Sequence, residues 1–272
     1  MLPSLNVDPR LLHSAAAAHL QPAAQAQQAQ QAPALMGNAA TVTLLVDLMR
    51  LPDGSHIRLP AYPELQVQTV TLAPGERLLA AERLLLRHAL VQRGELWVAA
   101  RHGGRAEPVT EGQWALDDGG RAWAASEQGP VQLLVLQHLR RLPGAEPSMQ
   151  EGAASAPLTL TTDYTGEPIT MPDAALRVLV NRYEVLPNAT LPWHLNPHQR
   201  YAYVERGQLE VQDLAGRSHV YGPGETVVEQ RQTVHRGINR GAQPVSLLVF
   251  DYVPKEKRSN TVLHPAQSSS AR

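Results

Sequence analysis

Short runs of alternating apolar and polar residues make up most of the chain between residues 41 and 254. The runs are rich in Val, Leu and Tyr, as in Tyr-Ala-Tyr-Val at 201–204 and Val-Ser-Leu-Leu-Val-Phe at 245–250. Gly or Pro interrupts them roughly every 8–12 residues, which is the spacing of turns in antiparallel sandwiches and barrels. The pattern therefore predicts an all-β fold.

One segment has helical rather than alternating spacing, and an internal repeat decides how it folds. In the segment 74–90 the residues Leu78, Leu79, Leu85 and Leu86 would line one helical face. However, the segment 70–98 aligns without a gap with 183–211, at an offset of 113 residues, so that "RGELWV" meets "RGQLEV". Farther on, "EGQWALDDGG" (111–120) meets "GPGETVVEQR" (222–231), and "GPVQLLVL" meets "QPVSLLVF". Two copies of one β domain follow, and the segment should be strand in both.

The two ends of the chain differ from this pattern. Residues 14–34 are almost wholly Ala, Gln and Pro, and such a composition has too few large apolar groups to build a core. We therefore expect a disordered arm over residues 1–40, a first domain over 41–145, a second over 155–254 and a flexible tail over 255–272.

Composition and charge exclude several kinds of partner. The 272 residues include 24 Lys and Arg against 25 Asp and Glu, a net charge of −1. No basic block stands out, so we expect neither a nucleic acid nor a membrane surface as a partner. A small-molecule ligand is the expected partner, and a homodimer is compatible with the sequence.

The chain has no cysteine, so any chemistry must come from His, carboxylates, Arg or Tyr. The longest apolar runs are too short to span a membrane, and the N-terminus lacks the pattern of a signal peptide. A cytoplasmic location is the default expectation.

The repeated segments resemble the cupin superfamily, small antiparallel β-barrels of the jelly-roll type that carry two motifs. These read G-x5-H-x-H-x3,4-E-x6-G and G-x5-P-x-G-x2-H-x3-N, and the duplication resembles a bicupin with two tandem barrels. In the second copy the first motif becomes Asn188, His194, Asn196, Arg200 and Gly207. The second motif becomes Gly224, Gln230, Gln232, His235 and Asn239.

The first copy keeps turn positions of the motifs but none of their ligands. Asn188 aligns with Gly75 of the first copy, and Asn and Gly most readily take a left-handed turn. Glycines also stand at Gly94, Gly112 and Gly120, whereas the four ligand positions hold Ala81, Arg83, Arg87 and Trp123. We expect this copy to be a barrel without a metal, which packs against or dimerises with the second copy.

The resemblance implies a divalent ion held by three His and a carboxylate, but the second copy has Asn196 and Arg200 at two of these positions. A guanidinium stays charged and would repel the ion. A bulge at Pro197 could turn His198 inward, so that His194, His198 and His235 would be the metal ligands, with Gln199 offering an amide oxygen. On this prediction at most one divalent ion (Fe, Mn, Ni or Zn) binds, in the C-terminal barrel.

Three functions remain open at this point. The first is the binding of a small polar or anionic metabolite by Arg200, Gln199 and Asn196, in which Arg200 is an anion receptor. The alternative for Arg200 is an internal ion pair. The second function is a metal-dependent cupin enzyme, an oxygenase or isomerase, and the third is a metal-free isomerase or epimerase. His194 and His235 are the candidate catalytic residues.

Overall fold

Antiparallel strands form nearly all of the regular structure. The computed structural model describes residues 36–99, 105–141 and 158–265, and one short 3-10 helix, η1 (Gly37–Ala39), precedes the first strand. The strands of the first part are β1 (Ala40–Leu48), β2 (Glu64–Leu72), β3 (Arg77–Leu78), β4 (Leu84–Arg93), β5 (Glu95–Ala99), β6 (Ala106–Thr110), β7 (Trp114–Asp117), β8 (Ala122–Ala125) and β9 (Val131–Leu139). Those of the second part are β10 (Leu158–Leu160), β11 (Leu176–Val185), β12 (His194–Leu195), β13 (Gln199–Arg206), β14 (Leu209–Asp213), β15 (Ser218–Tyr221), β16 (Thr226–Glu229), β17 (His235–Ile238), β18 (Val245–Pro254) and β19 (Val262–Leu263).

The two halves of the chain have the same order of strands. In the N-terminal half, one sheet has the order β2-β9-β4-β7 and the facing sheet has the order β3-β8-β5-β6. In the C-terminal half, the orders β11-β18-β13-β16 and β12-β17-β14-β15 repeat this arrangement strand by strand. The segment with helical spacing forms β3 and β4, so the prediction of strand is confirmed. The antiparallel sheets and their order are consistent with the jelly-roll arrangement expected from the sequence.

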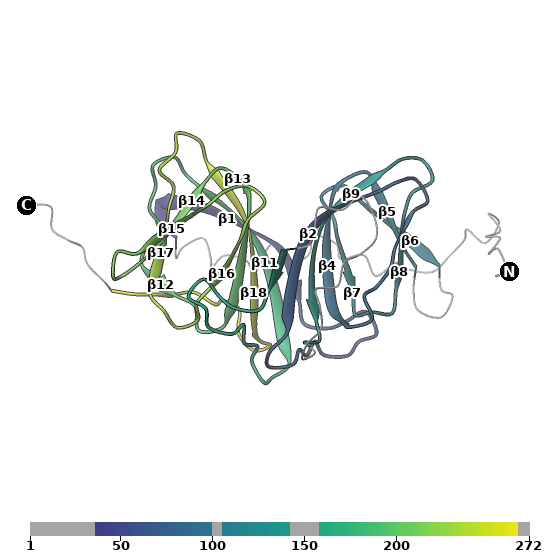
Figure 1. Cartoon of the computed structure of the whole chain (residues 1–272), viewed down its shortest axis with the longest axis horizontal. Helices are drawn as coiled ribbons and strands as arrows, with labels where there is room; N and C mark the ends of the chain where they lie inside the picture. The colour runs from purple at the N-terminus through teal and green to yellow at the C-terminus, as the bar shows by residue number, and fades with distance from the viewer. Residues whose placement is uncertain (1–35, 100–104, 142–157, 266–272) are drawn as a thin grey trace, which may run out of the picture.

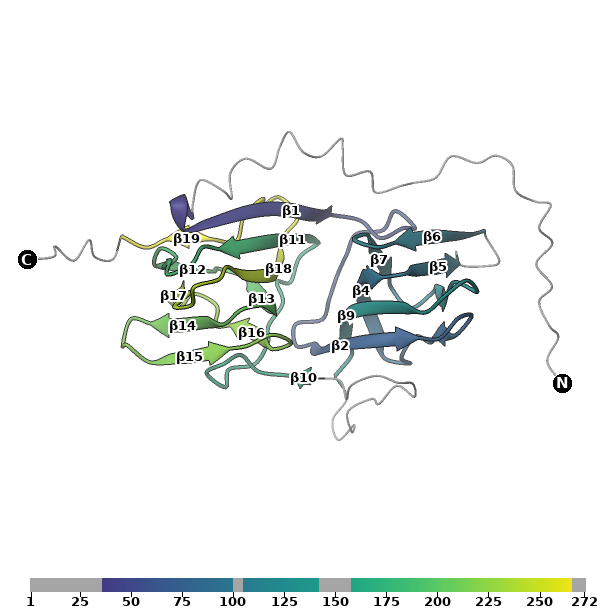
Figure 2. The same cartoon turned by 90° about the horizontal axis from the view of Figure 1, so that it is seen from above.

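The two halves also exchange one strand each. Strand β1 precedes the N-terminal half but pairs with β11, and β10 precedes the C-terminal half but pairs with β2. Figure 2 shows β1 lying along the C-terminal half and β10 along the edge of the N-terminal half. The exchange adds backbone hydrogen bonds between the halves to the contacts of their side chains.

Three apolar clusters follow from the alternation of side chains. One cluster lies inside the N-terminal half and one inside the C-terminal half. The third fills the space between the halves, where β2, β4 and β9 face β11, β13 and β18 (Figure 1). Each central sheet therefore buries both faces, which explains why its strands are apolar almost throughout.

The two ends of the described chain pack more closely than the sequence predicts. The predicted arm lies mostly outside the described residues, but its residue Met36 is 1% exposed and belongs to the C-terminal cluster. The prediction of a flexible tail also differs from the structure as far as residue 265, because Asn260 is 1% exposed and β19 pairs with β12. Side-chain hydrogen bonds and strand pairing, which composition does not reveal, hold these segments.

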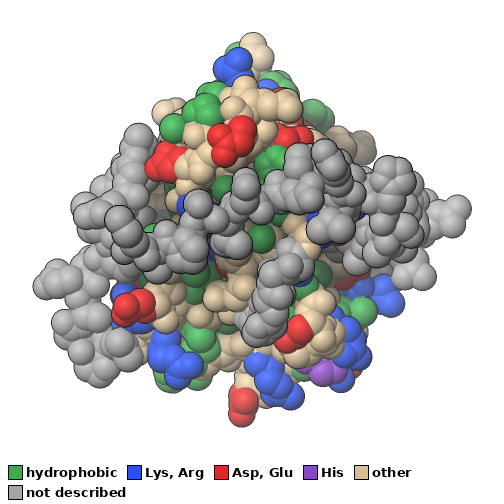
Figure 3. All heavy atoms as spheres, turned by 90° about the vertical axis from the view of Figure 1, so that its right-hand side faces the viewer, with side chains coloured by type: hydrophobic (Ala, Val, Ile, Leu, Met, Phe, Trp, Pro, Cys, Tyr) green, Lys and Arg blue, Asp and Glu red, His purple; other side chains and the backbone are tan. Residues whose placement is uncertain are grey.

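At the outer end of the N-terminal half, the described residues show acidic, basic and apolar side chains interspersed (Figure 3). Within the described ranges, no helix is both long enough and apolar enough to cross a membrane.

Candidate metal centre

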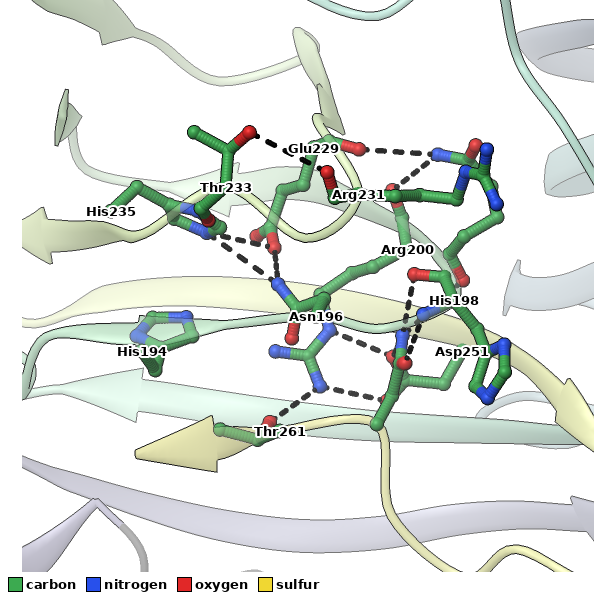
Figure 4. Close-up of polar contacts among 12 residues, drawn as sticks. His194, Asn196, His198, Arg200, Glu229, Arg231, Thr233, His235, Asp251 and Thr261 are labelled. Atoms are coloured by element: carbon green, nitrogen blue, oxygen red, sulfur yellow. Dashed lines mark hydrogen bonds and ion pairs between the residues drawn. The ribbon is translucent and has the colours of Figure 1, made fainter. Parts of the chain in front are cut away.

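Strands of two different sheets bring together two histidines and one carboxylate inside the C-terminal half. These are His194 on β12, Glu229 on β16 and His235 on β17, and their potential ligand atoms all lie within 4.8 Å of one another. All three side chains are buried (Figure 4). The cluster contains both histidines that the sequence singled out, together with a carboxylate that it did not.

The two histidines are placed by strand pairing and by hydrogen bonds to the backbone. His194 and His235 stand directly opposite each other in the β12–β17 pair, and their ring centroids are 4.7 Å apart. The Nδ1 atom of His194 lies 2.8 Å from the carbonyl oxygen of Pro192, and that of His235 lies 2.9 Å from that of Thr233. A carbonyl oxygen only accepts, so each Nδ1 carries a proton and donates it. The Nε2 atoms are the ones left to face Glu229.

Glu229 was missed because the carboxylate was expected at the cupin-motif position that Arg200 occupies, and the alignment of the repeat also slipped by one residue in this strand. The ungapped match placed Asp117 over Val228, whereas the sheet pairs Arg87 with Asp117 and Arg200 with Glu229. A shift of one residue turns a strand's side chains to the opposite face. The correct register was legible in the turns, because Gly112 and Gly224 both have positive φ and start the two equivalent strands.

Arg200 forms an internal ion pair, which was the alternative to an anion receptor. Its Nε and Nη2 atoms donate to the two carboxylate oxygens of Asp251, at 2.7 and 3.0 Å, and Nη2 also donates to Thr261 Oγ1 at 2.9 Å. The side chains of Arg200 and Asp251 are 4% and 3% exposed. The face of the guanidinium that would clamp an anion is therefore occupied, and Asp251 balances the charge that seemed to exclude a metal.

The other predicted ligands have different positions. Asn196 lies beside the centre, where its Nδ2 donates to Glu229 and lies 3.5 Å from His235 Nε2. Gln199 is buried, but its amide bonds the backbone of Thr170, Arg200 and Glu229. His198 is outside the cluster, and its backbone N–H donates to Asn260 Oδ1 at 2.9 Å. No inward bulge brings its ring to the other two histidines, and Figure 4 shows it pointing away from them.

The protonation of the cluster is governed by burial and by the close approach of its members. Burial disfavours the charged form of Glu229, but His235, Arg200 and His194 together outweigh burial and lower the pKa of the Glu229 carboxyl to about 2. Burial likewise opposes the charging of His235, but Glu229 and the hydrogen bond to the Thr233 carbonyl together raise the pKa of that imidazole. Burial, followed by the charge of His235, lowers the pKa of His194 to about 4. An ionised carboxylate therefore stands beside one neutral imidazole.

The residues present fit a divalent ion. Two ligand atoms that are each about 2.1 Å from one ion lie at most about 4.2 Å apart, so the three side chains need only a slight closure. His235 Nε2 lies 3.1 Å from Glu229 Oε2, and a bound cation would take the place of the proton that these two atoms share. The buried Asn196 Oδ1 has no hydrogen-bond partner among the described residues, so an acceptor is left beside the centre. Two imidazoles and a carboxylate suit Fe, Zn and related divalent ions.

A cavity of about 20 Å³ adjoins the centre. Its polar end is formed by the triad and Arg200, and the rest of its wall is mainly apolar, with contributions from Met36, Leu191, Leu209, Val211, Leu247 and Val249. About 10–15 Å³ holds one water molecule, so the cavity has room for one small molecule beside the ligand atoms.

The interior of the N-terminal half is closed by other residues. Arg87 donates to Asp117 at 2.7 Å, both side chains are fully buried, and the guanidinium lies 3.9 Å from the ring centre of Trp123. In the pairing register Trp123 stands opposite Val98 as Gly237 stands opposite Val211, so its counterpart is Gly237 and not His235. Within the described residues, no metal-type cluster of His and carboxylates lies in this half.

Comparison with known proteins agrees with the fold. Residues 181–251 match the cupin domain family. This range includes all three members of the cluster, His194, Glu229 and His235. This segment therefore belongs to the cupin superfamily. No curated protein matches the sequence.

Several solved structures are similar at low identity. AerE from Microcystis aeruginosa is 15% identical, with 77% of this chain and 98% of that chain covered and a TM-score of 0.47. A cupin 2 conserved barrel domain protein from Leptotrichia buccalis is 12% identical, with 79% and 89% covered and a TM-score of 0.40. Bacillus subtilis oxalate decarboxylase, described for its Mn(II) centres, is 16% identical, with 80% and 78% covered and a TM-score of 0.49.

Proposed function

We propose that the C-terminal half is a metal-dependent cupin enzyme in which His194, Glu229 and His235 hold one divalent ion. The observation that carries this proposal is the buried cluster itself, with two imidazole Nε2 atoms and a carboxylate converging on one point. Three protein ligands leave further coordination positions for a small ligand. The bound ion would supply Lewis acidity or redox chemistry to that ligand.

The chain's own residues favour an oxygenase over an isomerase. A set of two His and one carboxylate is typical of non-haem iron oxygenases. An isomerase needs a free general base, but both histidines donate Nδ1–H to the backbone and direct Nε2 into the cluster. The adjoining cavity of about 20 Å³ also suits a small co-substrate rather than a sugar.

The proposal is tested by metal analysis and titration of untagged protein. We expect one Fe, Mn, Ni or Zn ion per chain after purification, and one site in a Co²⁺ titration of the metal-free protein. Glu229→Gln and His235→Ala should each weaken Co²⁺ binding by about 100-fold or more, since loss of even an outer partner costs about 10–100-fold. His198→Ala is the matched control and should bind normally. Unchanged affinity in Glu229→Gln would contradict the proposal.

A second candidate function is the binding of a small polar or anionic molecule without catalysis. It is supported by the cavity beside the triad, whose lining residues include His194, His235 and Arg200. Formate, acetate and oxalate can be titrated into wild-type protein and into Glu229→Gln, both free of metal. Binding that persists in the variant would favour this function, whereas binding that requires the metal-loaded wild type would favour the enzyme.

We also propose that the two halves are tandem cupin barrels, over 41–145 and 155–254, which exchange strands β1 and β10. The support is the repeated order of the strands in the four sheets. The cytoplasmic location and a homodimer stay predictions.

A further inference from the structure

The segment that follows β18 returns to the C-terminal half and lies against the strand that carries His194. Strand β19 pairs with β12, with Leu263 opposite His194 and Val262 opposite Leu195. The backbone N–H of His264 donates to the carbonyl oxygen of Trp193 at 2.9 Å. We name residues 260–264 the C-terminal strap. Strand β12 has only two residues, so these contacts are a large part of what holds His194 in place.

Asn260 joins the strap to the loop between His194 and Arg200. Its Oδ1 accepts from the backbone N–H of His198 at 2.9 Å, and its Nδ2 donates to the carbonyl oxygen of His198 at 3.0 Å. The same Nδ2 donates to Asp251 Oδ1 at 2.9 Å. One buried side chain therefore connects the loop to the carboxylate that binds Arg200.

Thr261 contacts the guanidinium itself. Its Oγ1 accepts from Arg200 Nη2 at 2.9 Å and hydrogen-bonds the hydroxyl of Tyr183. Glu229 lies directly opposite Arg200 in the sheet, on the neighbouring strand. If the guanidinium of Arg200 lost its contacts with Asp251 or Thr261, Glu229 would be the nearest carboxylate that could bind it. Glu229 would then move away from the histidines.

The N-terminal half offers a comparison with this arrangement. Strand β3 is the counterpart of β12, and in the described structure it ends its sheet with β8 as its one neighbour. There Arg87 does bind the carboxylate on the neighbouring strand, Asp117. Among the described residues, the half in which the strap contacts the arginine is the one whose second carboxylate stays beside the histidines.

We propose that the C-terminal strap is a positioning element of the metal centre, in which Asn260 and Thr261 hold Arg200 on Asp251 and β19 holds His194. This inference rests on the proposed metal site. The strap sends no ligand to the ion, so it acts through the orientation of His194 and through the availability of Glu229.

Full-length protein, a chain that ends after Ser259 and a chain that ends after Pro265 provide the test, with Co²⁺ as the probe. Ending after Ser259 should weaken Co²⁺ binding by about 10–100-fold and alter the Co²⁺ absorption spectrum, as expected for loss of outer-shell support. Ending after Pro265 keeps the strap and should change neither. Circular dichroism reports whether each chain is folded.

Two point variants separate positioning from folding. Thr261→Val should weaken Co²⁺ binding by roughly 10-fold, and Thr261→Ser, which keeps the hydroxyl, should restore it. Wild-type affinity and spectrum in folded Thr261→Val and in the chain ending after Ser259 would overturn the inference. If the shorter chain does not fold, Thr261→Val and Asn260→Ala decide. A wild-type protein that binds no Co²⁺ would instead refute the metal site itself.

Discussion

The two halves share one framework, and their interiors differ in which carboxylate holds the central arginine. In both halves an arginine on the inner strand, Arg87 or Arg200, is flanked in register by a residue on each neighbouring strand. In the N-terminal half the flanking residues are Asp117 and Gln137, and the carboxylate binds the arginine. The difference between the interiors begins with these neighbours.

In the C-terminal half both flanking residues are acidic. Asp251 stands where the N-terminal half has Gln137, and it takes the arginine through two hydrogen bonds. Glu229 is then left for His235. The second carboxylate thus makes a metal centre compatible with a buried arginine, because a buried charge needs a partner and each charge here has one.

The size of one side chain adds to the contrast. Trp123 is fully buried and covers Arg87, whereas its counterpart Gly237 has no side chain and lines the cavity beside the triad. A Cβ atom at Gly237 would lie 3.1 Å from Leu191 Cδ1 and 3.2 Å from Leu209 Cδ1, so a larger residue would have to displace its neighbours. One interior is filled by an indole ring and the other retains a small space.

The largest effect is expected when Asp251 is made like Gln137. Asp251→Gln leaves Arg200 without its charged partner, which costs about 3–5 kcal/mol unless another carboxylate takes its place. Glu229 is the nearest candidate, so Co²⁺ affinity should fall by about 100-fold, as for loss of a ligand. Denaturation and Co²⁺ titration measure the two effects.

Asp47→Gln is the matched control for this variant. Asp47 binds Arg177 on β11, in another Arg–Asp pair outside the cluster. It should lower stability without changing Co²⁺ affinity. If Asp251→Gln bound Co²⁺ like wild type, the difference between the two halves would not depend on this carboxylate.

Breaking the pair in the N-terminal half should affect stability alone. Arg87→Met leaves Asp117 buried without its charge partner, and about 3 kcal/mol of stability should be lost. The double variant Arg87→Met/Asp117→Asn removes both charges and should recover part of this loss. Co²⁺ affinity should stay at the wild-type value in both, and a tenfold change would show that the two interiors are coupled.

The smallest expected effect is on the pH dependence of stability. It arises in the space between the halves, where aromatic rings from both halves meet. His88 and His138 contact Tyr252 with ring centroids 6.2 and 4.7 Å away. Burial lowers the pKa of His88 to about 4 and holds that of His138 well below its usual range. Both are neutral when folded, so the unfolded chain binds more protons once the pH falls below about 6.5.

Stability should therefore be highest above about pH 6.5 and should fall as the pH drops from there towards 4. His88 contributes at most about 3 kcal/mol to this loss. His88→Leu should flatten the dependence between pH 7.5 and 5 in urea denaturation, and exposed His219→Ala should not. An unchanged slope in His88→Leu would show that this histidine is not held neutral in the fold.

Local patterning was enough to predict the framework of this protein. Alternation and turn residues predicted strands, and the repeat overruled the helical spacing of residues 74–90. The turn positions were also correct, since Asn188 and Gly75 both have positive φ, at 56° and 73°. His194 and His235 were selected because they stand at histidine positions of the two cupin motifs that the sequence resembles.

Which residues form the metal centre could be known only from the pairing register of strands that are far apart in the sequence. Glu229 and Asp251 come from strands β16 and β18, and only the pairing of both with β13 shows that they flank Arg200. The cupin motif placed the carboxylate at position 200, and a one-residue error in the alignment of the repeat hid the correspondence of Glu229 with Asp117. The expectation that Arg200 would repel a metal ion likewise assumed that its positive charge had no partner.

The sequence by itself determined the β class, because alternation and turns are properties of neighbouring residues, and it indicated the two histidines through their match to the cupin motifs. Tertiary structure alone decided that Glu229 joins those histidines, that Asp251 holds Arg200, and that residues 260–264 pack beside β12. These contacts join residues far apart in the chain, and their energies depend on burial and on which charges meet. Neither quantity is defined until the sheets have paired and packed.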